Sequence, residues 1–112
     1  MALDDKTYRT LVEECLGYWL DIFEESEGFD ELDLADGVLQ AETEDGKTFI
    51  LNRHVPLRQV WLSSPVSGAH HYAYDEASGR WLSTRGGEAL ADRLAQDLAA
   101  IAIDIAGLAI GD

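Results

Sequence analysis

Apolar residues near the start of the chain repeat with the period of an α-helix. From about Asp4 to Glu27 they are spaced three or four residues apart, at Tyr8, Leu11, Val12, Cys15, Trp19, Ile22 and Phe23. The opposite side of this helix is almost purely anionic and carries Glu13, Glu14, Asp21, Glu24, Glu25 and Glu27. Asp4 or Asp5 can cap its first turn, and Gly28 suits its end. The pattern therefore predicts a long amphipathic helix with an acidic polar face.

The hydrophobic period then changes to two. Two Asp-Gly pairs, Asp36-Gly37 and Asp45-Gly46, each lie between alternating segments. Asp-Gly favours a type I′ hairpin turn, because both central residues of that turn need positive φ. The pattern predicts strands at about 31–36, 38–44 and 47–53, followed after Pro56 by RQVWLSS, AHHYAY and RWLS, with PVSG and DEASG as the turns between them.

A helical period returns after Gly86. An apolar stripe of Leu90, Leu94, Leu98, Ile101 and Ile105 runs through residues 89–105, and the apolar tail AGLAIGD is expected to pack against the body. A helix, hairpin-linked strands and a second helix make an α+β fold. We predict a single domain over residues 1–112: a two-layer α-β sandwich, with an antiparallel sheet of about six strands and the N- and C-terminal helices packed on one face.

Strand parity predicts which side chains reach the uncovered face of this sheet. With Phe49, Leu51, Val60 and Leu62 directed to the core, the outward residues are Asn52, Gln59, Trp61, Ser63 and His71. Trp61 is then either a partner-binding anchor or an isolated surface tryptophan, and parity does not choose between them. His70 and His71 point to opposite faces and cannot chelate one ion together, while His54 lies near the loop before Pro56.

Charge is distributed very unevenly along the chain, whose 112 residues carry a net charge of −14. Residues 1–46 hold 15 acids against 2 bases, a net of −13, and residues 47–112 hold 7 acids against 6 bases, a net of −1. No Lys or Arg occurs between Thr10 and Gly46. Nucleic acid is not expected as a partner because phosphate binding needs the opposite sign, whereas cations and basic protein surfaces are natural partners.

Two further features narrow the class of protein. No apolar run approaches the roughly 20 residues that span a bilayer, and MALDDK at the N-terminus is neither a signal peptide nor a transit peptide. We therefore expect a cytoplasmic protein that does not contact membranes. The single cysteine, Cys15, provides no disulfide framework or thiolate zinc cluster, and is expected to be a small buried apolar residue.

The strand sequences also resemble a known family. The matching features are Asp36-Gly37-Val38-Leu39, Asn52, Pro56 and Gln59-Val60-Trp61-Leu62-Ser63-Ser64-Pro65, followed by Ser67-Gly68, Tyr72, Trp81 and Leu82. With an acidic helix upstream, this arrangement resembles the frataxin family, bacterial members included, over roughly residues 8–105. The resemblance implies the same α-β sandwich that the periodicity predicts.

The resemblance also implies a function and its sites. Frataxin-like proteins bind iron weakly through acids of the first helix and strand, and they bind the cysteine desulfurase and the scaffold protein that build iron–sulfur clusters. Carried over by position, the acidic ridge comprises Glu13, Glu14, Asp21, Glu24, Glu25, Glu27, Asp30, Glu31, Asp33 and Asp36. The corresponding partner-binding patch comprises Asn52, Gln59, Trp61 and His71. Eukaryotic relatives have an arginine where this chain has His71, which puts a cationic contact there in doubt, and they carry an N-terminal extension that is absent here, as expected for a bacterial member.

Carboxylates suit hard cations, among them Fe²⁺, Fe³⁺, Mn²⁺, Mg²⁺ and Ca²⁺. An EF-hand calcium loop is excluded because the acids that it requires before its glycine are missing at both Gly37 and Gly46. Acids that point outward from a helix and an edge strand do not close around one ion. We therefore predict weak, multiple and poorly selective iron sites, in which other divalent cations can substitute; a plain solvated acidic face is the alternative.

No catalytic constellation is visible in the sequence. We expect a non-enzymatic, iron-binding regulator or adaptor of iron–sulfur cluster assembly, monomeric or in iron-driven oligomers. Ferroxidase-type oxidation of Fe²⁺ at the ridge is a further activity proposed for the family. The alternative from another class is a small acidic chaperone that binds polypeptide without metal, which the Trp-Leu-Ser-Ser-Pro strand disfavours.

Overall fold

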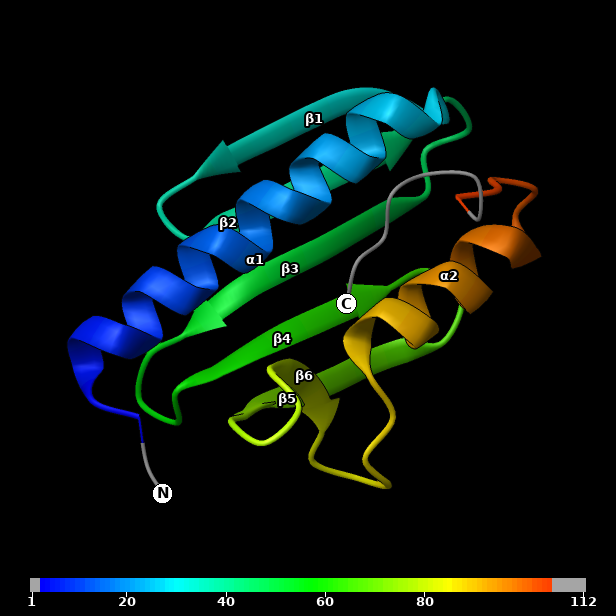
Figure 1. Ribbon diagram of the computed structural model, residues 1–112. Helices are drawn as coiled ribbons and strands as arrows, with labels where there is room; N and C mark the ends of the chain where they lie inside the picture. Colours follow the sequence, from blue (N-terminus) through cyan, green and yellow to red (C-terminus); the bar gives the residue numbers. More distant parts are fainter. Residues whose placement is uncertain (1–2, 106–112) are drawn as a thin grey trace.

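The computed structural model describes residues 3–105, which form two layers (Figure 1). One antiparallel sheet has its strands in chain order: β1 (Phe29–Ala35), β2 (Val38–Thr43), β3 (Thr48–His54), β4 (Gln59–Ser64), β5 (Gly68–Asp75) and β6 (Arg80–Ser83). Helices α1 (Asp5–Ser26) and α2 (Leu90–Ala100) both cover the same face of it. The predicted two-layer α-β sandwich is confirmed. No helix in the described part of the chain is long and apolar enough to cross a membrane.

The core lies between the helices and the inward positions of the strands. The apolar stripe of α1 is buried there, as are alternate strand residues such as Leu39, Ala41, Phe49, Leu51, Val60, Leu62 and Tyr72. Cys15 belongs to this core, as predicted, and burial raises the pKa of its thiol to about 12. Tyr8 is fully buried, and its hydroxyl donates a hydrogen bond of 2.7 Å to the Gln59 carbonyl, so the start of α1 is tied to the start of β4.

The ends of α1 are set by acids. Asp4 is the N-cap, and its carboxylate accepts a 2.7 Å hydrogen bond from the Thr7 amide. At the other end Glu27, rather than Gly28, takes the left-handed conformation, with φ of 58°. Gly28 is required for another reason: a Cβ there would lie 2.6 Å from the Ile103 side chain, which packs over it.

The two Asp-Gly hairpins differ in their turns. Asp36 and Gly37 have φ of 53° and 77°, which is the predicted type I′ turn. In the second hairpin only Gly46 has a positive φ, of 86°, and its amide donates to the Thr43 carbonyl at 3.0 Å. This is a type I turn followed by a left-handed glycine, so the type I′ prediction is wrong at Asp45-Gly46 although the hairpin itself forms.

The second helix is shorter than predicted. It ends at Ala100 instead of continuing to residue 105, because Ala102 is left-handed with φ of 66°. The amides of Ala102 and Ile103 donate back to the carbonyls of Ala99 and Leu98, at 3.1 and 2.8 Å, in the pattern of a Schellman motif. Ile105 still reaches the core and is 2% exposed. The tail AGLAIGD lies outside the described residues.

A buried carboxylate that the sequence did not reveal fastens α2 to the sheet. Asp97 is 1% exposed and accepts hydrogen bonds from the hydroxyls of Ser64 and Ser67, at 2.7 and 2.5 Å, at the β4–β5 turn. Arg93 donates to the same carboxylate at 3.1 Å and makes two further bonds of 3.1 Å to Glu88. The hydrogen bonds to Glu88 and then Asp97 raise the pKa of Arg93. The Ser-Ser-Pro sequence thus has a structural use, because one of its serines binds α2.

Replacing Asp97 by alanine should therefore destabilise the fold. The change leaves two hydroxyls and one guanidinium nitrogen without their buried acceptor, and we expect a loss of about 2–4 kcal/mol in the free energy of unfolding. Urea unfolding followed by circular dichroism measures this loss. The matched control is Asp92→Ala, which removes an exposed acid from the same helix and should cost less than about 0.5 kcal/mol. Equal losses in the two variants would contradict the role given to Asp97.

The end of α2 offers a stabilising substitution. Ala102→Gly removes the steric cost of a left-handed alanine, and we expect a gain of about 0.5–1 kcal/mol after allowing for the greater freedom of glycine in the unfolded chain. The same unfolding experiment applies. Ala99→Gly, at an exposed position inside the helix, should instead cost about 1 kcal/mol. A loss of stability in both variants would mean that Ala102 is not strained.

Candidate functional site

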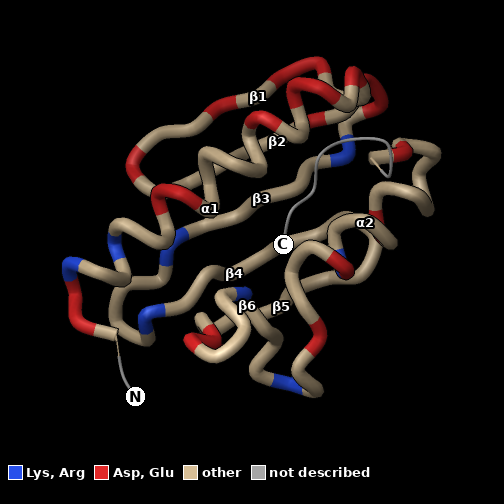
Figure 2. Tube along the Cα trace, viewed as in Figure 1, with Lys and Arg blue, Asp and Glu red and all other residues tan. Residues whose placement is uncertain are grey.

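The predicted acidic ridge lies along α1 and β1 and on the turn that follows β1. Figure 2 shows acids concentrated on these elements, with the bases mostly elsewhere in the fold. All ten predicted ridge acids are exposed, and none forms a side-chain hydrogen bond or an ion pair in residues 3–105. Apart from the electrostatic attraction between Glu13 and Arg9, the described part of the protein therefore does little to offset their charge.

The structure divides the helical acids between two flanks of α1. Glu13 lines a hollow of about 310 Å³ together with Asp36 and Arg53, on the side of β1. Glu14 lines a different pocket, of about 270 Å³, on the side of α2. The helical period places Glu24 with Glu13, and Asp21 and Glu25 with Glu14. The ridge is thus two rows of acids along one helix, and only the first row adjoins the acids of β1.

The acids of β1 meet a further acid that sequence reasoning missed. Glu31 and Asp33 pair directly with Glu42 and Gln40 of β2, on the uncovered face of the sheet. These four residues line a small hollow of about 120 Å³. The register that follows from the Asp36-Gly37 turn could have placed Glu42 there. No group of three or more His, Cys, Asp or Glu side chains in residues 3–105 is arranged to hold a metal ion.

The predicted partner-binding residues lie together on the uncovered face. Asn52, Trp61 and His71 are direct cross-strand partners on β3, β4 and β5, and they make one row across the sheet. Gln59 lies on the same face, where its side-chain oxygen accepts a 2.8 Å hydrogen bond from the Trp61 indole. These placements agree with strand parity; a role in binding remains a prediction.

His54 is the member of this face that the sequence did not indicate. It lies next to the loop before Pro56, as predicted, but as the last residue of β3, and its ring stacks on Trp61 with centroids 3.8 Å apart and planes 7° apart. His71 stacks on the other side of the indole, at 4.0 Å and 9°. The imidazoles thus sandwich Trp61. His70 points away from this stack and contacts the Ser67 hydroxyl at 2.8 Å.

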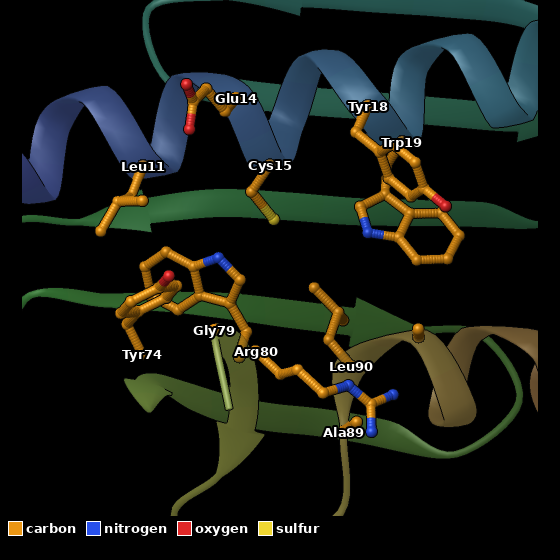
Figure 3. A pocket seen from close by; sticks show the side chains of 12 residues that line it. Leu11, Glu14, Cys15, Tyr18, Trp19, Tyr74, Gly79, Arg80, Ala89 and Leu90 are labelled. Carbon is orange, nitrogen blue, oxygen red and sulfur yellow. The ribbon is translucent and has the colours of Figure 1, made fainter. Parts of the chain in front are cut away.

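A pocket on the helical side is lined largely by aromatic and apolar residues. Figure 3 shows Leu11, Cys15 and Trp19 projecting from α1 toward Tyr74 and Leu90 on the opposite wall. Tyr18, Trp81 and Arg80 complete much of the lining. This pocket contains one ridge acid, Glu14, and lies on the other side of the sheet from the Trp61 stack.

The frataxin-like domain family matches residues 1–103 of the chain. The chain belongs to the frataxin family. It is 38% identical over 96 residues to the iron-sulfur cluster assembly protein CyaY of Azotobacter vinelandii, covering 86% of each chain. It is 35% identical over 111 residues to the protein of the same name from Pseudomonas fluorescens, covering 96% of this chain and all of the relative.

Solved frataxin structures share the fold. Frataxin from Psychromonas ingrahamii superposes with a TM-score of 0.79 at 26% identity, covering 92% of this chain and 98% of that one. Trimeric frataxin from the yeast Saccharomyces cerevisiae, complexed with ferrous iron, superposes with a TM-score of 0.69 at 30% identity, covering 89% and 87%. The resemblance inferred from the strand motifs is therefore confirmed.

The crowding of acids on β1 and β2 should lower the stability of the protein. Directly opposed like charges such as Glu31 and Glu42 repel each other across the strands, so Glu31→Gln should raise the melting temperature by about 1–4 °C at low salt. Glu76→Gln, in the exposed turn before β6, is the matched control and should change it little. Moderate NaCl, Ca²⁺ or Fe²⁺ should also stabilise the wild type. Unchanged melting under all these conditions would refute the repulsion argument.

Proposed function

We propose that this chain is a non-enzymatic, iron-binding regulator of iron–sulfur cluster assembly. On this proposal it binds iron weakly through the acidic ridge and docks on the cysteine desulfurase and its scaffold protein in the bacterial cytoplasm. The observation that carries the proposal is the set of ten exposed ridge carboxylates, none of which forms an ion pair in the described chain. The names of the bacterial relatives and the ferrous complex of a yeast frataxin support it.

The chemistry of the ridge suits weak binding of a hard cation. Carboxylate oxygens are good ligands for iron in either common oxidation state, and the concentrated negative charge attracts cations from solution. Because the acids are spread over two helix flanks and a strand, each ion would contact few carboxylates and keep much of its water. Iron that is bound this weakly also dissociates easily, which suits a protein that regulates the delivery of the metal and does not store it.

Docking would use the ridge and the uncovered sheet face together. Glu31, Asp33 and Glu42 lie on the same face as the row that contains Trp61, at its β1–β2 edge. A basic partner surface laid across this face would pair with the acids at one edge and with the amides and rings at the centre. In many interfaces a few residues near the centre, often tryptophan or tyrosine, contribute most of the binding energy. Trp61 would have that position here.

Amide NMR titrations test both halves of the proposal. With Fe²⁺ under anaerobic conditions, we expect broadening confined to residues 13–36 and neighbouring Glu42. With purified cysteine desulfurase, we expect shifts on the same segment and around Trp61. Broadening scattered over the fold, or none, would refute iron binding at the ridge; no shifts with desulfurase would refute docking.

Two variants make the iron titration specific. Glu24→Gln with Glu31→Gln removes one acid from the helix and one from the strand, and the iron needed for half-maximal broadening should rise several-fold. Glu76→Gln with Asp92→Asn removes the same charge from exposed positions elsewhere, and should leave that concentration nearly unchanged. Equal effects of the two pairs would indicate that net charge, and not the ridge, attracts iron. Capture of an unfolded polypeptide in place of desulfurase would favour the chaperone alternative.

A further inference from the structure

The three-ring stack on the uncovered face has an unusual composition. Both faces of the Trp61 indole are covered by imidazoles, at 3.8 Å by His54 and at 4.0 Å by His71, with all three planes nearly parallel. Trp61 therefore has no free ring face to offer a partner, and the stack presents its ring edges. The stack is also held in place from within, because the indole nitrogen donates to Gln59 on the same strand. A partner would meet a preformed, rigid platform and not a mobile tryptophan.

The two imidazoles lie in a part of the face that holds few charged side chains. The outward positions of β3, β4 and β5 are Thr48, Ile50, Asn52, His54, Gln59, Trp61, Ser63, Ala69, His71, Ala73 and Asp75. Asp75 is the one acid among them; it lies at the end of β5, where its carboxylate accepts hydrogen bonds from the amide and the hydroxyl of Ser78. Neither His54 nor His71 forms a hydrogen bond or an ion pair through its ring in the described residues, and Nδ1 of His54 is buried without a partner.

Other charged groups lie on the adjoining elements and turns. Glu42 of β2 pairs with Thr48 at the start of β3, and Arg80 of β6 pairs with Asp75. Arg53 is directed to the helical side, where it lines the hollow with Glu13 and Asp36, while Arg58 is on the β3–β4 turn and Arg85 follows β6. None is joined to either imidazole by a contact in residues 3–105. Uptake of a proton by both imidazoles would therefore add two positive charges at the stack itself.

We propose that the His54–Trp61–His71 stack is a proton-sensitive docking surface, which binds its basic partner only with both imidazoles neutral. The inference rests on the proposed function, since the partner is the desulfurase and scaffold complex. Two effects act in the same direction. Docking removes the ring edges from water, which is costly for a charged imidazole, and a basic surface repels it.

The sign of the linkage follows from this difference. The complex disfavours the protonated form, so docking expels protons and affinity is highest at the alkaline side of the range in which histidines titrate. As the pH falls through that range, affinity is lost, by up to about tenfold for each histidine over about one pH unit.

Phenylalanine substitutions distinguish the effect of protonation from the effect of ring stacking. The double variant His54→Phe and His71→Phe keeps two flat rings against Trp61 but cannot be protonated. Affinity for the purified desulfurase–scaffold complex is measured at pH 7.5 and at pH 5.5 for each protein, and the partner's own titration cancels in the comparison with wild type. We expect wild type to lose at least tenfold more affinity than the double variant. His70→Gln, at the histidine that faces away, should behave as wild type.

Calorimetry gives a second measurement that needs no variant of the stack. Binding of the wild type at pH 6.5, in two buffers of different ionisation enthalpy, counts the protons released on docking. We expect a net release of protons on docking, and the same release from His70→Gln. Parallel loss of affinity in wild type and the double variant, or no proton release, overturns the inference and leaves the proposed function intact. Absence of binding by wild type at both pH values would instead refute the proposed function.

Discussion

The burial of one face of α1 against the sheet holds together charges that repel one another. Seven side chains of this helix are buried, among them Tyr8, Trp19 and Phe23. Burial of one large apolar side chain contributes about 1.5–3 kcal/mol, whereas a like-charge pair one helical turn apart costs only about 0.2–0.5 kcal/mol. The core therefore outweighs the ridge by a wide margin. The position of the acids is fixed by packing beneath them and does not depend on contacts among themselves.

The second helix is attached by different means. It has no side-chain N-cap, and its helical stretch is half the length of α1. A buried carboxylate, Asp97, joins it to Ser64, which is the last residue of the strand that carries Trp61. Because inward and outward positions alternate, fixing Ser64 inward also fixes the outward direction of Trp61 on that strand. A polar contact on the helical side of the sheet thus supports the aromatic platform on the other side.

Period and turn chemistry were enough to predict the six strands, the two helices and the two layers, because each strand boundary has a Gly, Pro or Asp signal. Period and turn chemistry could not predict where α2 ends. The apolar stripe continues through Ile101 and Ile105, although the left-handed conformation of Ala102 shows that the helix has already ended. Nor could period and turn chemistry give the hydrogen bonds of Asp97, since its two serine partners are some thirty positions away in sequence.

The site was predictable in part for similar reasons. Strand parity placed Asn52, Gln59, Trp61 and His71 on one face, because parity depends only on local alternation. It did not bring His54 to Trp61, since that contact depends on the length of the turn between β3 and β4. The sequence also could not show that Glu13 and Glu14 lie on different flanks of α1, because that depends on which elements pack on either side of the helix.

The acids and the imidazoles on the uncovered face differ in how they carry charge. The acids of the β1–β2 edge attract a basic surface through their negative charge. On the further proposal, the histidines at the centre of the face make the affinity for that surface depend on pH. Encounter with a basic partner would then be governed by the ridge, and the stability of the complex by the protonation of the stack.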